Sequence, residues 1–268
     1  MKVTRQLKSF SGVGAGQTAT LDCQIGPSYH QALIAYSGVT LAQMTAIRVI
    51  ANGQVIHRYL SGTQLDNHNQ FQGRAAAAGI LVIDFERYNL NTRAAREVTA
   101  LGTGAPYDAK QNPTPITTLS IEIDIDSGAS APALSAKAVQ SGSKPTGVIK
   151  KVKQFTPAAT AAGEHQIADL PRGDLINMIR FENSDVSSMK VQQNNVETFV
   201  RTKAENTLLQ SDGKRVPVAA AFVVDPTESG DGAEGLVTAG LNDLRFTATM
   251  AAAGSIPTMV EYIGGLNG

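Results

Sequence analysis

The acidic residues Glu122, Asp124 and Asp126 are the clearest candidate metal ligands in this sequence. They alternate with isoleucines, so a β-strand would place all three carboxylates on one face, about 6.5–7 Å apart. Carboxylate oxygens are typical calcium ligands, although the row lacks the spacing of a calcium-binding loop. We therefore predict Asp124 and Asp126 as calcium ligands, with a solvated strand face as the alternative.

The other residues with possible chemistry do not form a recognisable catalytic set. Residues 225–240 hold a second acidic group on a Gly-rich loop, made of Asp225, Glu228, Asp231 and Glu234. The four histidines, none in the paired spacing of a cupin or helical zinc site, are His30, His57, His68 and His165. No Gly-x-Ser-x-Gly elbow and no phosphate-binding Gly-rich loop is present. We therefore predict that the chain is not an enzyme and expect the histidines to be surface or interface residues.

The composition limits the class of protein. A length of 268 residues suits two domains of about 100 to 150 residues each. The 23 basic and 23 acidic residues balance, which argues against nucleic-acid binding and leaves self-association unopposed. The single cysteine, Cys23, excludes an internal disulfide, and its apolar neighbours indicate a buried strand position. Without a signal-peptide pattern or a run of about 20 apolar residues, we expect a soluble chain made in the cytoplasm.

An internal repeat describes the elements that must position these residues. Three pairs of segments match in the same order, at shifts of about 142, 141 and 125: 47–49 with 189–191, 82–84 with 223–225, and 119–132 with 244–257. In the last pair, apolar and polar residues alternate strictly, which is the period of a half-buried strand. The repeat therefore predicts two β-domains with the same order of strands.

The predicted organisation follows from this repeat and from the turn signals. Roughly eight short strands per domain, separated by turns every 8 to 12 residues, suit a sandwich or jelly roll. The expected segments are an irregular arm over 1–16, a first jelly roll over 17–130, a linker over 131–146 and a second jelly roll over 147–268. The segments 102–115 and 225–240 are expected to be exposed loops.

A series of short motifs follows one order from residue 25 to the C-terminus. The motifs are IGPSY at 25–29, YSGVT at 36–40, ALGT at 100–103, DID at 124–126, PALSA at 132–136, IADLPR at 167–172 and VEYIG at 260–264. Each motif alone is unspecific, but the collinear set resembles the major capsid protein of corticoviruses. These are tailless, icosahedral bacteriophages with a membrane inside the shell.

This resemblance implies an all-β double jelly roll with a few short helices. It further implies a homotrimeric, pseudo-hexagonal capsomer that builds an icosahedral shell around an internal membrane and a DNA genome. The implied partners are other copies of the chain, other capsid proteins such as a vertex penton protein, and the internal viral membrane, without sequence-specific nucleic-acid binding. The implied location is the virion capsid, assembled in the host cell cytoplasm. Calcium is associated with capsids of this family.

Two alternatives belong to other classes of protein. A carbohydrate-binding β-sandwich protein, such as a viral spike or a lectin, would need an aromatic platform for sugar stacking, and the chain has no Trp and only six Tyr. A bicupin-type enzyme would need the histidine pair that the sequence lacks.

Overall fold

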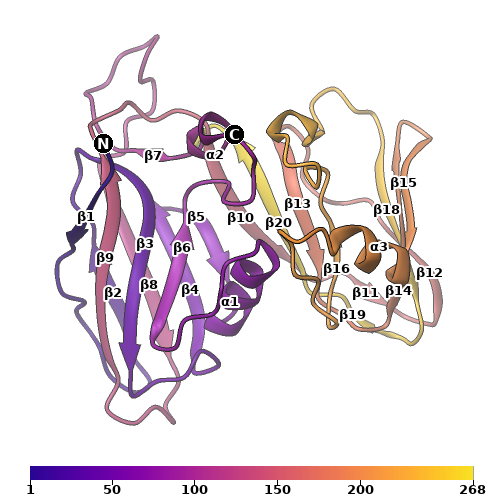
Figure 1. Ribbon diagram of the computed structural model, residues 1–268, viewed down its shortest axis with the longest axis horizontal. Helices are drawn as coiled ribbons and strands as arrows, with labels where there is room; N and C mark the ends of the chain where they lie inside the picture. The colour runs from indigo at the N-terminus through magenta and orange to yellow at the C-terminus, as the bar shows by residue number, and fades with distance from the viewer. Residues whose placement is uncertain (268) are drawn as a thin grey trace.

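The computed structural model describes residues 1–267, which form two β-sandwiches that lie side by side (Figure 1). Strict alternation in the sequence produces their strands: β8 (Leu119–Ile125) and β18 (Leu244–Met250) each bury every second residue. The buried residues of each sandwich form a separate hydrophobic core. The predicted fold class, two tandem jelly rolls with few helices, is confirmed.

The first sandwich consists of two facing sheets. One sheet has the order β1 (Val3–Gln6), β9 (Ala133–Ser141), β3 (Ser28–Ser37) and β6 (Ile80–Asp84), and β7 (Leu101–Gly102) also pairs with β3. The facing strands have the order β2 (Thr18–Asp22), β8, β4 (Met44–Ala51) and β5 (Gln54–Tyr59). Asn52 and Gly53 form the tight turn between β4 and β5, as predicted, and both have positive φ.

The second sandwich repeats this order strand for strand. One set of strands is β10 (Ile149–Phe155), β20 (Thr258–Gly264), β13 (Leu175–Phe181) and β16 (Phe222–Val224), and β17 (Leu236–Val237) also pairs with β13. The facing sheet is β12 (Gly163–Ile167), β18, β14 (Val186–Gln193) and β15 (Val196–Thr202). A small ladder joins β11 (Ala158–Ala159) to β19 (Gly254–Ser255). Thus β10-β20-β13-β16 corresponds to β1-β9-β3-β6, and β12-β18-β14-β15 to β2-β8-β4-β5.

The matched sequence segments fall on corresponding strands. Residues 47–49 and 189–191 lie on β4 and β14, and the matched segments 119–132 and 244–257 begin with β8 and β18. The pair 82–84 and 223–225 lies at the ends of β6 and β16. The internal repeat predicted from the sequence is therefore a repeat in the fold.

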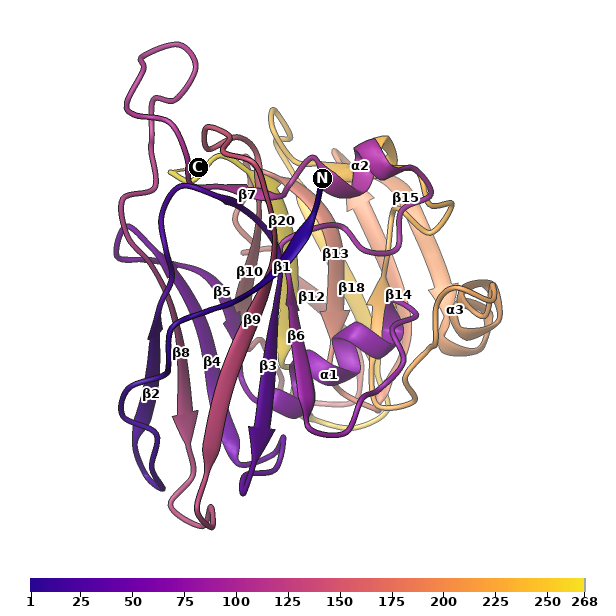
Figure 2. The same ribbon diagram turned by 60° about the vertical axis from the view of Figure 1, so that its left-hand side comes forward.

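Helices occur at the same position in each sandwich. Helix α1 (Gly62–Phe71) follows β5, and α3 (Lys203–Gln210) follows β15, with the hydroxyls of Ser61 and Thr202 as N-caps. Helix α1 lies between the two sandwiches, whereas α3 lies on the outer side of the second one (Figures 1 and 2). The short helices α2 (Arg93–Glu97) and η1 (Gly232–Glu234) lie in loops. Within residues 1–267, no helix has the length and apolar character needed to cross a membrane.

The structure corrects two of the predicted segments. Val3–Gln6, expected in an irregular arm, forms β1 and pairs with β9. Strand β9 itself lies within residues 131–146, which were expected to be a linker. The linker prediction is wrong there because the inward positions carry Ala136 and Ala138, small residues that resemble linker composition but are fully buried between sheets. The first sandwich therefore runs from Val3 to Ser141.

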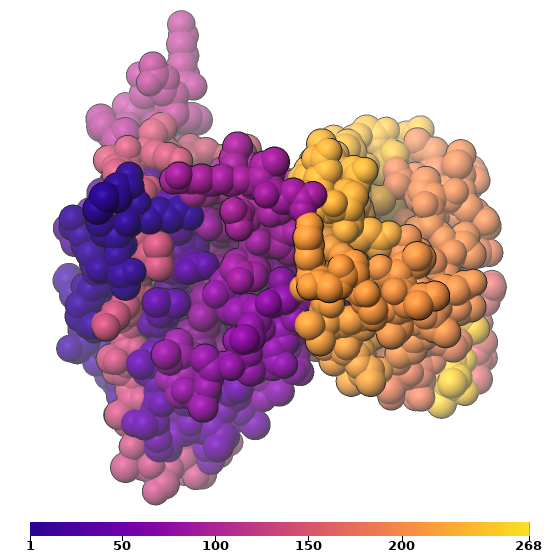
Figure 3. Space-filling view, viewed as in Figure 1, coloured from indigo at the N-terminus to yellow at the C-terminus, as the bar shows by residue number. Residues whose placement is uncertain are grey.

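The two expected loops differ from each other. Residues 105–111 are exposed and form a loop that projects from one end of the first sandwich (Figure 3), whereas Thr103 and Asn112 are buried. The prediction of an exposed loop is only partly right for 225–240, because the segment contains η1 and β17 and its residues Asp225, Thr227 and Thr238 are buried.

The two sandwiches share one sheet. Strands β5 and β10 pair in parallel at His57 and Val152, which joins the strands of both domains into a single nine-stranded sheet. Strands β1 and β15 remain as outer edges of the other two main sheets.

Candidate functional site

The contact between the two sandwiches contains a buried charged group, Glu261 on β20. Its carboxylate accepts hydrogen bonds from His68 Nε2 on α1 at 2.9 Å and from Asn177 Nδ2 on β13 at 2.8 Å. Lys150 Nζ lies 3.3 Å from the same carboxylate. Burial alone would raise the pKa of Glu261, but Lys150 and His68 outweigh burial and lower it. Glu261 is therefore a buried anion that both domains neutralise.

Lys150 and His57 extend this network across the paired strands β10 and β5. Lys150 Nζ donates to the Glu86 carbonyl at 3.2 Å, and the Lys150 carbonyl accepts from His57 Nε2 at 3.0 Å. Burial, reinforced by the charge of Lys150, lowers the pKa of His57 to about 3. The neutral ring stacks on Phe85, with 5.4 Å between ring centroids. Polar and aromatic contacts thus hold the strands on each side of the junction.

Further contacts surround this network. Gln64 Nε2 on α1 donates to Glu182 at 2.7 Å, and Arg87 donates through Nε to Asn177 at 2.8 Å. Phe71 of α1 packs with Met178 and Val223 of the second sandwich in a small apolar cluster. Because buried charged pairs need fixed geometry to offset desolvation, this junction favours one relative orientation of the sandwiches.

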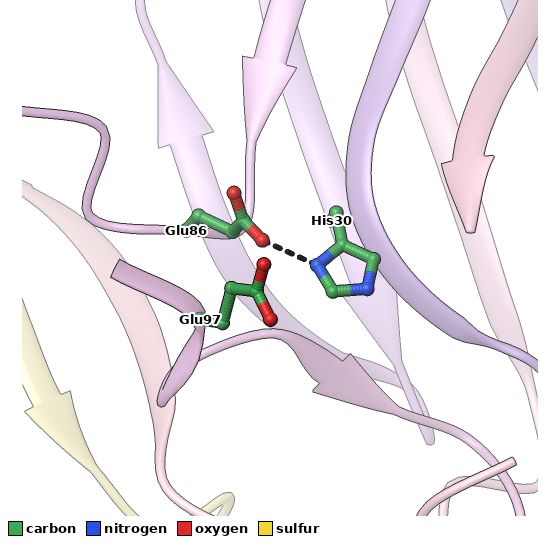
Figure 4. Close-up of side chains that lie close together, drawn as sticks. All are labelled: His30, Glu86 and Glu97. Atoms are coloured by element: carbon green, nitrogen blue, oxygen red, sulfur yellow. Dashed lines mark hydrogen bonds and ion pairs between the residues drawn. The ribbon is translucent and has the colours of Figure 1, made fainter. Parts of the chain in front are cut away.

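A second cluster joins His30, Glu86 and Glu97 in the first sandwich (Figure 4). Within residues 1–267, it is the only group of three or more His, Cys, Asp or Glu whose ligand atoms lie within 4.8 Å of one another. His30 Nδ1 donates to Glu86, and its Nε2 forms a hydrogen bond with Ser141 Oγ at 2.8 Å.

Lys2 provides the positive charge of this cluster. Its Nζ lies 2.6 Å from Glu86 and 2.9 Å from Glu97. Burial opposes ionisation of both carboxyls, but Lys2 with His30 lowers the pKa of Glu86, and Lys2 with Arg93 lowers that of Glu97 to about 2. The cluster therefore acts as an ion-pair network that attaches the N-terminus to the loops after β6.

The predicted calcium ligands Asp124 and Asp126 do not meet in such a group. The Arg48 guanidinium donates to both oxygens of Asp124, at 2.7 Å each, and this contact is the main cause of the lowered pKa of Asp124. Asp126 accepts instead from the backbone N–H of Gly128 at 2.7 Å, in the turn after β8. Glu122 also accepts from Arg48, at 3.1 Å. Calcium binding there stays a prediction, and the ion would have to displace Arg48.

The remaining candidates have structural roles. In the second acidic set, Asp225 pairs with Arg215 and Glu228 with Arg201. His165 is half-buried on β12, whereas the other three histidines are buried, two of them at the junction. Cys23 is buried as predicted, and burial raises its pKa to about 12.

Sequence reasoning missed the junction network. Its only local signals were Glu261 within the otherwise apolar segment TMVEYIG and Lys150 next to the buried positions of β10. Charged residues at buried strand positions indicate a contact beyond the domain's own core.

Each of the two sandwiches matches a known protein domain. A model of the viral coat protein P2 N-terminal domain matches residues 4–141, and one of the P2 C-terminal domain matches residues 149–266. The chain belongs to the viral coat protein P2 family. The predicted resemblance to corticovirus major capsid proteins is thus confirmed.

Relatives of the P2 family agree with this assignment over nearly their whole length. The major capsid protein P2 of Pseudoalteromonas phage PM2 is 28% identical over 275 residues, which cover 98% of this chain and 97% of that protein. A crystal structure of the PM2 protein gives a TM-score of 0.90 at 25% identity, covering 99% of this chain and 98% of that one. A protein in the structure of Sulfolobus turreted icosahedral virus shows the same fold, with a TM-score of 0.70 at 10% identity and coverage of 99% and 91%. The supported function is that of a viral major capsid protein, a structural role.

Proposed function

We propose that three copies of the chain close into a pseudo-hexagonal capsomer that builds an icosahedral shell around a membrane and a DNA genome. The observation that carries this proposal is the strand-for-strand equivalence of two sandwiches held side by side in one chain. Three such chains supply six similar domains, so a three-fold ring can occupy a six-fold position in a lattice.

The junction supports ring closure. A ring of alternating domains closes only if the angle between the two domains of a chain is constant, and the buried network around Glu261 together with the shared sheet favours one orientation. Obligate interfaces between copies of this kind commonly bury about 2,000 Å² or more.

The partners follow from the capsomer. Capsomers contact one another laterally, a penton protein fills the five-fold vertices, and the inner surface faces the viral membrane. The protein is located in the virion and assembles in the cytoplasm of the host cell. No observation on the chain favours carbohydrate binding or a bicupin-type reaction.

Light scattering on the purified full chain tests the capsomer. The expected mass is three times 28.1 kDa, and negative-stain electron microscopy should show particles with a hexagonal outline. A stable monomer at micromolar concentration contradicts the proposal.

A further inference from the structure

We propose that the contact between copies repeats the junction within the chain. In this contact, strand β15 and helix α3 of one copy dock on the edge strand β1 and the outer face of the β1-β9-β3-β6 sheet of the next copy. This inference rests on the trimer proposed above and names the surfaces that form it.

The junction within the chain provides the template. Strand β5 lies beside β10, and helix α1 packs on the outer face of the β10-β20-β13 strands. By the equivalence of the two sandwiches, β5 and α1 correspond to β15 and α3, and β10 corresponds to β1. Within residues 1–267, β15 and β1 each pair on one side only, so both are sheet edges, and they lie at opposite ends of the molecule (Figure 1). Each copy therefore carries both surfaces of a second junction, β15 with α3 at one end and β1 at the other, and neither surface contacts the other within the chain.

The two helices can be aligned residue by residue. Asn69 Nδ2 of α1 donates to the Val82 carbonyl at 2.8 Å, and Gln210 Nε2 of α3 donates to the Val223 carbonyl at 3.0 Å. Both donor and acceptor are shifted by 141 residues, as are the N-caps Ser61 and Thr202.

This alignment identifies the side chains of α3 that face a partner. It places Leu208 at the position of Asn67 and Leu209 at that of His68. His68 is buried in the junction, whereas Leu208 and Leu209 are 76% and 55% exposed. Val200 on the adjacent strand β15 is 58% exposed, which extends the apolar surface to the sheet edge.

The receiving sheet can be aligned through its strand register. Strands β3 and β13 each carry a bulge at the equivalent position. After the bulge, Gln31 on β3 lies opposite Val139 on β9, and Met178 on β13 lies opposite Glu261 on β20. Val139 is therefore the equivalent of Glu261.

Leu33 is the equivalent of Arg180 by the same register. Leu33 lies opposite Val82, and Arg180 lies opposite Val223, so the pairing with β6 and β16 gives the same alignment as the helices.

The two alignments predict the contacts between copies. His68 meets Glu261 within the chain, so Leu209 of one copy meets Val139 of the next. Arg180 donates to the Asn67 carbonyl within the chain, so Leu208 of one copy lies over Leu33 of the next. At both positions, polar residues on the two sides of the junction correspond to apolar residues on the two sides of the proposed contact. Leu208 and Leu209 are exposed, and Leu33 and Val139 are half-buried. Apolar residues that match in this way are typical of a surface that another copy covers.

Mass measurement on a double variant, Leu208→Asp with Leu209→Asp, tests the helix side. Both side chains are exposed, so circular dichroism should show that the fold persists. The mass should fall from three times 28.1 kDa to that of a single chain, because the variant places charge against an apolar face. Tyr107→Asp is the control, since Tyr107 is 67% exposed on the projecting loop and should leave the trimer intact. A double variant that remains trimeric overturns the inference.

Cross-linking tests the pairing itself. A chain with Leu209→Cys and Val139→Cys should form covalent trimers with a short bismaleimide, because each copy then links to the next. Helix α3 and strand β9 lie at opposite ends of one chain, so a link within the chain is not expected (Figures 1 and 2). Single variants, and the pair Leu209→Cys with Lys110→Cys, should remain uncoupled.

The outcomes separate this inference from the capsomer. If the unmodified chain is trimeric but the Leu209 and Val139 cysteines do not couple, the inference is wrong and the capsomer stands. If the unmodified chain is monomeric, the capsomer fails, and the inference fails with it.

Discussion

Arg215 donates through Nε to Asp225 at 2.7 Å, in the same position where Arg74 pairs with Asp84 at 2.8 Å in the first sandwich. Both members of the pair are shifted by 141 residues. In the first sandwich the pair joins the end of β6, and in the second the end of β16, to the segment after the helix. The two sandwiches therefore share individual ion pairs as well as an order of strands.

Asp225→Asn should destabilise the chain more than Asp84→Asn. The side chains of Arg215 and Asp225 are almost fully buried, whereas Arg74 is 19% exposed. Loss of Asp225 removes the buried counter-charge of Arg215, which keeps only the partly exposed Asp212 at 2.8 Å. Removing one partner of a buried pair costs up to about 3–5 kcal/mol, and less where water reaches the guanidinium, as at Arg74. Urea unfolding measures both variants, and equal losses would contradict this account.

Glu261→Gln should weaken the junction although it preserves the shape of the side chain. Lys150 then has no buried counter-charge beside it, and a loss of about 3–5 kcal/mol in the free energy of unfolding is expected. Glu164→Gln is the matched control, because Glu164 is exposed on β12. A loss no larger than that of the control would show that the buried charge is not important for stability.

His57 should make stability fall as the solution becomes acidic. The unfolded ring binds a proton below a pH of about 6.5, whereas the folded ring, with its pKa lowered to about 3, stays neutral. Between these values the unfolded state holds the extra proton, so stability decreases by about 1.4 kcal/mol for each pH unit lost. His57→Gln keeps a side-chain N–H donor but does not titrate. Its unfolding free energy should vary less between pH 6.5 and 4 than that of the unmodified chain, and parallel curves would exclude His57 as the cause.

Arg48→Gln should increase calcium binding at the row of acidic residues on β8. In the unmodified chain Arg48 occupies both oxygens of Asp124, so calcium must compete with a guanidinium. Isothermal titration calorimetry should show tighter calcium binding by the variant. Adding Asp124→Asn to that variant should abolish the gain, and a gain that survives it would place the ion elsewhere.

Local sequence patterns predicted the elements that local physics determines. Alternation identified β8 and β18, and Asn52-Gly53 predicted the hairpin, because strand periodicity and turn conformation depend on neighbouring residues. Strand β9 was missed because alanines at its buried positions carry little hydrophobic signal.

The junction was beyond such reasoning. His68 and Glu261 are 193 residues apart, and nothing near either residue specifies the other. The same applies to Asp124, where the row of carboxylates was visible in the sequence but its partner Arg48, 76 residues away, was not.

The sheet that passes from β2 to β16 through the β5–β10 pair has a mechanical consequence. The backbones of the two halves of the subunit pair at His57 and Val152, so bending one half against the other would separate these strands and expose Glu261 to water. A shell tiled from such stiff plates can change its curvature, at facet edges or under internal pressure, only at the seams where separate plates meet.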